Sequence, residues 1–101
     1  MYNQEETTIK LNKFRDARNW QKDHLPEELA RSLMIEAAEL NRIFQWPTMK
    51  RPIDRVNLAE ELADILIYTT MLCGDYGFDM QQIVDNKIAM NGVKYPVQLV
   101  G

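Results

Sequence analysis

With 101 residues, an apolar fraction of 46% and a formal net charge of -3, the chain suits one globular domain rather than a disordered segment. Its basic residues are scattered among acids and no segment is long and apolar enough for a signal core or a membrane span, which argues against nucleic-acid and membrane partners. The single cysteine, Cys73, cannot form an internal disulfide, and we expect a cytoplasmic protein.

A first helix is predicted from about Thr8 to Gln21. Apolar residues recur there at spacings of three and four, which place them on one face of an α-helix. The hydroxyl of Thr7 or Thr8 can cap the first amide groups. The polar, mixed-charge residues 1–7 in front of the helix are expected to be flexible.

A second helix is predicted to open at Leu25-Pro26, because proline suits the first turn of a helix and interrupts the preceding one. It ends at Phe44 or Trp46, since Pro47 cannot continue it. Its apolar residues share one stripe, and they are Leu29, Leu33, Leu40, Ile43 and Phe44.

Two more helices follow a proline-containing loop at 47–53. The third begins at Asp54, a good capping residue, and runs to about Tyr76, where a glycine stops it. The fourth begins at Asp79, again a capping residue, and runs to about Val93.

Four helices joined by short loops predict an all-α, four-helix bundle-like domain over 1–101, with 97–101 as a tail. Residues 65–73 of the third helix are apolar nearly all round, and such a helix must be covered on several sides. We therefore expect a homo-oligomer that covers this segment. Burial within one chain is the alternative.

Two pairs of carboxylates stand on neighbouring predicted helices. Glu36 and Glu39 are three residues apart on the second helix, and Glu61 and Asp64 are three apart on the third. Side chains at this spacing share a helical face, so the two pairs can converge. Glu36 and Glu61 also fall within apolar stripes, where ionised groups are costly unless they are paired or bound to a metal.

The chemistry of these four side chains favours a hard cation. They offer only oxygen ligands, which suits Mg²⁺, or Mn²⁺, better than zinc. A di-iron bundle would need Glu-x-x-His motifs, and the only histidine, His24, stands elsewhere. Magnesium held by carboxylates usually awaits phosphate oxygens, so the expected ligand is a nucleotide or another phosphoester. A solvated or ion-paired acidic face is the competing interpretation.

Four motifs then stand out along the chain: Phe14-Arg15-x-x-Arg18-x-Trp20-x-x-x-His24, Glu36-Ala-Ala-Glu39-Leu40 with Phe44-Gln45-Trp46, Glu60-Glu61-Leu62-Ala63-Asp64-Ile65-Leu66-Ile67-Tyr68, and Lys87-x-x-x-Asn91-x-x-Lys94-Tyr95-Pro96. Together they resemble the MazG-like nucleoside triphosphate pyrophosphohydrolases. The resemblance is nearest to the small single-domain branch that includes the dCTP pyrophosphatases, and it covers most of the chain.

The resemblance implies hydrolysis of nucleoside triphosphates to the monophosphate and pyrophosphate, as house-cleaning of surplus or non-standard nucleotides. It implies Mg²⁺ held by four ligands, Glu36, Glu39, Glu61 and Asp64. It also implies a dimer, or a tetramer built as a dimer of dimers, whose sites borrow residues from a neighbouring subunit. Some dCTP-type relatives carry a histidine three residues before the position of Phe14, where this chain has Leu11. This chain therefore lacks a polar contact to the nucleotide, and the resemblance predicts a preference for dCTP less firmly than it predicts the pyrophosphohydrolase activity.

Seven further residues are predicted to bind the nucleotide: Trp20, His24, Trp46, Tyr68, Lys87, Asn91 and Tyr95. The indoles suit stacking on a base, and the two polar residues of the last motif share a helical face suited to phosphate or sugar oxygens. Each also has a purely structural interpretation, as a core aromatic, a loop histidine, a packed tyrosine or a solvated helix face.

The leading hypothesis is thus a magnesium-dependent nucleoside triphosphate pyrophosphohydrolase that favours dCTP-like substrates. One alternative is a non-catalytic helical interaction or regulatory module that uses its acids as an electrostatic face. Another is a different magnesium-dependent nucleotide phosphohydrolase. Convergence distinguishes the first from the second, because ligands of one metal must approach within about 5 Å across the two helices.

Overall fold

The computed structural model describes residues 1–46 and 52–98. Within these residues the chain is all-helical, as predicted, with elements α1 (Gln4–Ala17), η1 (Gln21–Asp23, a 3-10 turn), α2 (Pro26–Gln45), α3 (Arg55–Tyr76) and α4 (Met80–Lys94). In this part of the chain, no helix is long and apolar enough to cross a membrane.

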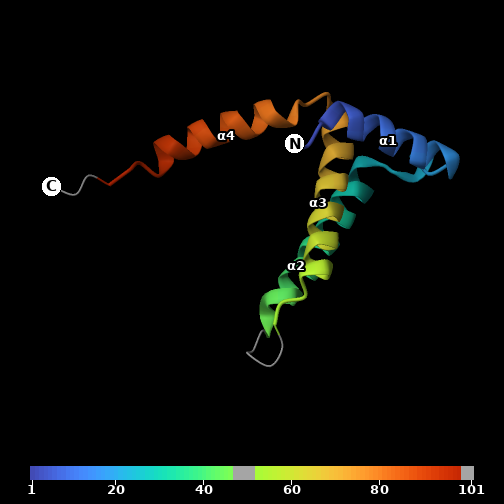
Figure 1. Cartoon of the computed structure of the whole chain (residues 1–101). Coiled ribbons are helices and arrows are strands. Elements are labelled where there is room, and N and C mark those ends of the chain that lie inside the picture. Colours follow the sequence, from blue (N-terminus) through green and yellow to red (C-terminus); the bar gives the residue numbers. More distant parts are fainter. Residues whose placement is uncertain (47–51, 99–101) are drawn as a thin grey trace.

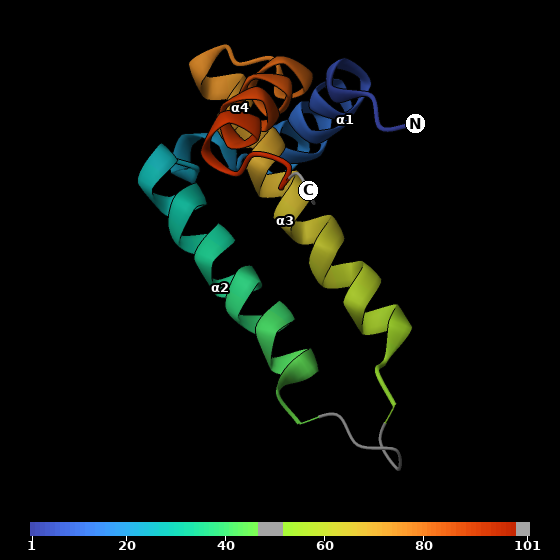
Figure 2. The same cartoon turned by 90° about the vertical axis from the view of Figure 1, so that its left-hand side faces the viewer.

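Helix α2 and helix α3 form an antiparallel pair that lies side by side along most of its length (Figures 1 and 2). The Asp54 side chain caps α3 by accepting from the amides of Val56 and Asn57, both at 3.1 Å. At the other end Gly77 adopts φ 68, a left-handed conformation that favours glycine. Both ends agree with the prediction, whereas most of the predicted loop at 47–53 lies outside the described residues.

Helix α1 differs from its predicted position. It begins at Gln4 rather than Thr8, because the Asn3 side chain caps it and accepts from the Glu6 amide at 2.9 Å. Residues 4–7, expected to be flexible, are therefore helical. The helix ends at Ala17 rather than Gln21, since Asn19 adopts φ 56 and turns the chain.

The N-terminal end of α1 is attached to the junction between α3 and α4. The Gln4 side chain donates to the Phe78 carbonyl at 2.8 Å and accepts from the Met80 amide at 2.7 Å. The Tyr2 hydroxyl is hydrogen-bonded to that of Thr70, which is fully buried. These contacts place α1 across the end of α3 that leads to α4 (Figure 2).

Helix α4 projects away from the other helices (Figure 1). All of its residues from Gln81 onward are exposed, including Ile88 at 63% and Val93 at 84%. The helices of one chain therefore do not close into the expected four-helix bundle. The core of the described chain is small, and its buried apolar residues are Leu29, Met71 and Cys73. The bundle expectation failed because α4 turns away from the others after Gly77.

Candidate functional site

Three carboxylates meet midway along the α2–α3 pair. Glu36 of α2 and Glu61 and Asp64 of α3 each offer an oxygen, and these oxygens all lie within 4.8 Å of one another. The spacing of Glu61 and Asp64 puts both on the face of α3 that is turned toward α2. All three side chains are half-buried. The predicted convergence of the two helices is thus found for three of the four acids.

Glu39 is the acid that does not join this cluster. Its carboxylate lies 3.7 Å from the guanidinium of Arg42 on the same helix, and the two side chains are 46% and 73% exposed. An ion pair this exposed contributes little to stability. The Glu39 charge is nevertheless near enough to raise the pKa of Glu36 slightly.

The electrostatics of the cluster show crowded negative charge. The pKa of Glu36 rises to about 7, chiefly because a hydrogen bond with Glu61 favours its protonated form, and further because of burial and the charges of Glu61 and Asp64. Oxygen Oε2 of Glu61 is buried and has no hydrogen-bond partner among the described residues. A divalent cation would relieve the repulsion and give this oxygen a partner, so the residues fit a site for a hard metal ion.

A pocket of about 410 Å³ lies beside the cluster, between α1, the turn that follows it and α3. Asp64 contributes to its wall, which joins the pocket to the carboxylates. Three of the residues predicted to bind the nucleotide also line it, namely Trp20, His24 and Tyr68. One chain therefore brings a candidate metal site and an aromatic pocket together.

The turn after α1 positions the aromatic wall of this pocket. The Trp20 amide donates to the Arg15 carbonyl at 2.9 Å, and the indole meets the Phe14 ring edge-on with centroids 5.6 Å apart. The His24 ring is 6.0 Å from that of Trp20. Trp20 is 45% exposed, and Nδ1 of His24 is buried without a hydrogen-bond partner in the described part of the chain. The wall thus offers an accessible indole and one unused polar atom.

The other four residues predicted to bind the nucleotide lie elsewhere. Trp46 follows the C-terminal end of α2, whereas His24 precedes the start of that helix, and Trp46 is 71% exposed. Lys87 and Asn91 are exposed on α4, and Tyr95 follows that helix. Because α4 projects away, a single chain does not bring Lys87, Asn91 and Tyr95 to the carboxylates (Figure 1).

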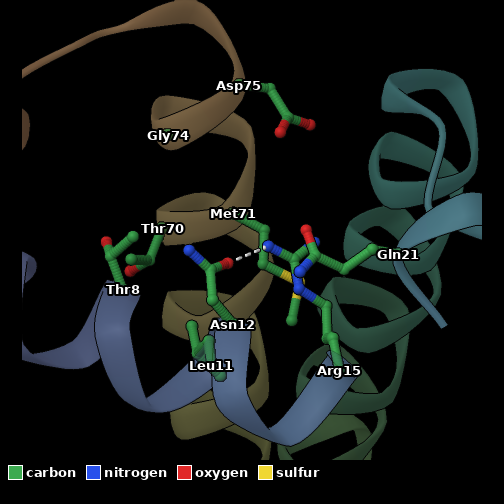
Figure 3. Close-up of a pocket in the computed structure, with 9 residues that line it drawn as sticks. All are labelled: Thr8, Leu11, Asn12, Arg15, Gln21, Thr70, Met71, Gly74 and Asp75. Atoms are coloured by element: carbon green, nitrogen blue, oxygen red, sulfur yellow. Dashed lines mark hydrogen bonds between the residues drawn. The ribbon is translucent and has the colours of Figure 1, made fainter. Parts of the chain in front are cut away.

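Arg15 is the residue of this region whose position the sequence did not reveal. It is only 6% exposed and lines both the aromatic pocket and a neighbouring cavity of about 150 Å³ (Figure 3). Its spacing from Leu11, one turn earlier on the same face of α1, was the available signal. A buried arginine is rare enough that the spacing alone could not identify it.

Comparison with known proteins shows the family to which the chain belongs. The model of the MazG-like family matches residues 31–99. The chain is 37% identical to dCTP pyrophosphatase 1 of Mus musculus and 34% identical to that of Homo sapiens, in each case over 93 residues, 85% of this chain and 55% of the relative. It thus spans about half the length of these curated relatives.

A solved structure is similar over nearly the whole chain. It is the crystal structure of a pyrophosphatase from Archaeoglobus fulgidus, with a TM-score of 0.83 and 37% sequence identity, and the match covers 96% of this chain and 95% of that one. The family model, which covers more than half of the residues, agrees with this match. On this basis the chain belongs to the MazG-like family.

Proposed function

We propose that this protein hydrolyses nucleoside triphosphates to the monophosphate and pyrophosphate. Water adds across the bond between the α- and β-phosphates, so that bond breaks and each product gains an oxygen or a proton from the water. The observation that carries the proposal is the convergence of Glu36, Glu61 and Asp64 beside the aromatic pocket. The names of the similar proteins, a pyrophosphatase and several dCTP pyrophosphatases, support it.

The three clustered carboxylates are the proposed ligands of Mg²⁺, with Mn²⁺ as the alternative ion. Glu39 is proposed as a fourth ligand, because it follows Glu36 by one turn and its contact with Arg42 is a weak surface pair. When bound, the ion would neutralise charge on the phosphates and lower the pKa of a coordinated water. The acids themselves keep the cation at the Asp64 side of the pocket.

The aromatic wall is the proposed nucleotide site. The exposed face of Trp20 can stack on a base, an interaction worth about 1–3 kcal/mol. The unpartnered Nδ1 of His24 can exchange a hydrogen bond with base or sugar. Tyr68 lies one turn beyond Asp64 on α3, so it can contact the sugar that joins the base to the phosphates. We propose dCTP-like substrates and a role in house-cleaning of the deoxynucleotide pool, which the relatives' names support.

A homo-oligomer is proposed to complete the site. The exposed apolar residues of α4, such as Ile88 and Val93, and the half-exposed Leu62 and Leu66 of α3 leave more apolar surface uncovered than a stable monomer usually has. A second copy could cover these surfaces and bring its own Lys87, Asn91 and Tyr95, with Trp46, to the nucleotide. We favour a dimer of dimers, with a dimer as the alternative.

The proposal is tested by identifying the products. Purified protein is incubated with Mg²⁺ and each deoxynucleoside triphosphate, and the phosphorus-containing products are resolved by ³¹P NMR. Monophosphate with pyrophosphate supports the proposal. Diphosphate with inorganic phosphate would instead indicate a different nucleotide phosphohydrolase.

Matched variants separate catalysis from a surface role of the acids. Asp64→Asn and Glu61→Gln should abolish turnover, whereas Glu60→Gln should not, because Glu60 is an exposed acid adjacent to the cluster and outside it. No turnover by the unmodified protein with any triphosphate, together with no effect of Mg²⁺ on its stability, would favour a non-catalytic interaction module.

A further inference from the structure

Arg15 is a buried cation that has no acidic partner among the described residues. Its side chain enters the space between α1 and α3, and only 6% of the residue is exposed. Nitrogen Nη2 donates to the Asn12 side chain at 2.7 Å, while Nε is buried and has no partner in the described chain. Buried arginines are normally paired with carboxylates. This guanidinium therefore has hydrogen-bonding capacity that the protein itself does not use.

The nearest acid on this cavity does not supply the missing partner. Asp75 lines the same small cavity, but no ion pair joins it to Arg15 among the described residues. Figure 3 shows the Arg15 and Asn12 side chains meeting next to Met71, whereas Asp75 lies higher in the view, apart from them. Arg15 thus lines both cavities with a guanidinium whose Nε donates to no described residue.

The position of Arg15 relative to the carboxylates indicates which part of a nucleotide it could reach. Arg15 and Met71 line both the aromatic pocket and the small cavity, and Asp64 lines only the pocket. Asp64 and Met71 are seven residues apart on α3, which corresponds to about 10 Å along the helix. Phosphates held at Asp64 would therefore place the sugar near Tyr68 and the base near Arg15.

We infer that Arg15 binds the base of the nucleotide and selects bases that present a carbonyl oxygen to it. The inference rests on the proposed function, since it takes the phosphates to lie at the carboxylates. A guanidinium only donates hydrogen bonds, so its ligand must supply acceptors. Cytosine, thymine and guanine each present a carbonyl oxygen, whereas adenine offers only ring nitrogens as acceptors, and its exocyclic group is an amino donor. Arg15 therefore favours the first three over adenine.

The competing role of Arg15 is to attach α1 to α3. Its main-chain carbonyl accepts from the amides of Arg18 and Trp20, and these backbone hydrogen bonds do not involve the side chain. A substitution of Arg15 therefore tests the side chain alone. A purely structural side chain would, when replaced, lower the stability and reduce the activity on every nucleotide alike. A base-binding side chain would change the ratio of activities between bases.

The experiment compares Arg15→Gln and Arg15→Lys with Arg31→Gln. Arg31 is an exposed arginine on α2 that is paired with Glu28 and lies outside the pocket. Its replacement removes one positive charge, as Arg15→Gln does, without changing the pocket. We measure kcat and KM for the four deoxynucleoside triphosphates. We also follow the binding of dCMP, dAMP and inorganic phosphate by NMR titration without metal. The second measurement needs no turnover and keeps the inference testable even if the protein does not hydrolyse triphosphates.

Arg15→Gln should lower kcat/KM for dCTP, dTTP and dGTP by about 10- to 100-fold, mainly through KM, because a hydrogen bond to a charged group is lost. The value for dATP should change by less than about 3-fold. Arg15→Lys should recover only part of the loss, since an ammonium lacks the planar fork. Arg31→Gln should leave all four values unchanged, and dCMP should bind the unmodified protein more tightly than dAMP.

Three results would overturn the inference. Equal losses on all four triphosphates would show a structural role for Arg15. Binding of inorganic phosphate that Arg15→Gln removes, with dCMP and dAMP bound equally, would show a general anion site. If Arg15→Gln does not fold, an unchanged ratio of dCTP to dATP activity in Arg15→Lys is the refuting result. Failure of the proposed function is distinct from all three, since it is the absence of triphosphate turnover by the unmodified protein.

Discussion

Replacing Glu61 by glutamine should stabilise the metal-free protein at neutral pH while it removes a ligand of the proposed metal site. Glu61 is the main reason that the pKa of Glu36 rises from 4.5 to about 7, first through a hydrogen bond and then through its charge. A glutamine removes the charge, and its amide can donate to the ionised Glu36 carboxylate. Both changes return the pKa of Glu36 toward its ordinary value.

The sign of the effect follows from linkage. Below about pH 4.5 Glu36 is protonated in both the folded and the unfolded protein, and the raised pKa has no cost. As pH rises from about 4.5 to about 7, the unfolded state loses its proton more readily, so the folded state is progressively destabilised; above the folded pKa the cost stays constant. The full shift corresponds to about 3 kcal/mol, and solvent screening at this half-exposed site leaves on the order of 1 kcal/mol.

The assay is urea unfolding of the metal-free protein at pH 5 and pH 8, at one fixed protein concentration because oligomerisation also changes stability. Unmodified protein should be less stable at pH 8 than at pH 5. Glu61→Gln should flatten that dependence and gain about 1 kcal/mol at pH 8, which is about 4–8 °C in Tm for a domain of this size. The exposed neighbour variant Glu60→Gln should keep the original dependence. A Glu61→Gln protein that is less stable at pH 8, or equally pH-dependent, would refute the reasoning.

Three further outcomes follow from the same structure. Mg²⁺ should raise the Tm of the unmodified protein, because binding at a hundred times its Kd adds about 2.7 kcal/mol to the free energy of unfolding. In the same melting scan the Tm of Asp64→Asn should not change with Mg²⁺, and equal shifts in both proteins would show that Asp64 is not part of the site. Trp20→Ala should raise KM for the preferred triphosphate by about 10- to 100-fold through lost stacking, measured in steady-state assays, and an unchanged KM would contradict the aromatic wall. Gln4→Leu should lower the free energy of unfolding by about 1–3 kcal/mol, because the Phe78 carbonyl and the Met80 amide both lose their partner; urea unfolding with an unchanged midpoint would show that α1 does not depend on this contact.

The ends of α3 could be predicted because they depend on neighbouring residues. The Asp54 carboxylate reaches amides two and three residues away, and Gly77 supplies the left-handed conformation that stops the helix. The start of α1 has a local signal, the Asn3 cap, which the polar, mixed-charge composition of residues 1–7 outweighed in the prediction. The contacts of Gln4 with Phe78 and Met80 also hold this end of the helix, and they join residues far apart in the sequence that no local pattern connects. The predicted start was therefore wrong, and so was the predicted flexibility of residues 4–7.

The carboxylate cluster could also be predicted only in part. Helical spacing and apolar surroundings correctly brought Glu36 together with Glu61 and Asp64. The same spacing could not reveal that Glu39 turns toward Arg42, because two side chains three residues apart share a face yet still differ in direction around the helix. Whether Glu39 joins a bound cation stays a prediction, and the metal titration of a Glu39→Gln variant tests it directly.

The proposed site residues lie on different helices, and this explains why Lys87 and Asn91 of α4 could not be placed relative to the acids from the sequence. The α2–α3 pair holds the acids, and α1 with its following turn adds Trp20 and His24 to form a pocket within a single chain. Helix α4 carries its polar residues beyond Met80, on an exposed segment that projects away from the other helices. Periodicity identifies the face on which Lys87 and Asn91 lie, but within the described residues that face is exposed, and only the proposed oligomer would give it a neighbour. The pocket should therefore bind a nucleoside monophosphate even in a protein diluted to the monomer, whereas any contribution of α4 to triphosphate binding should disappear on dilution.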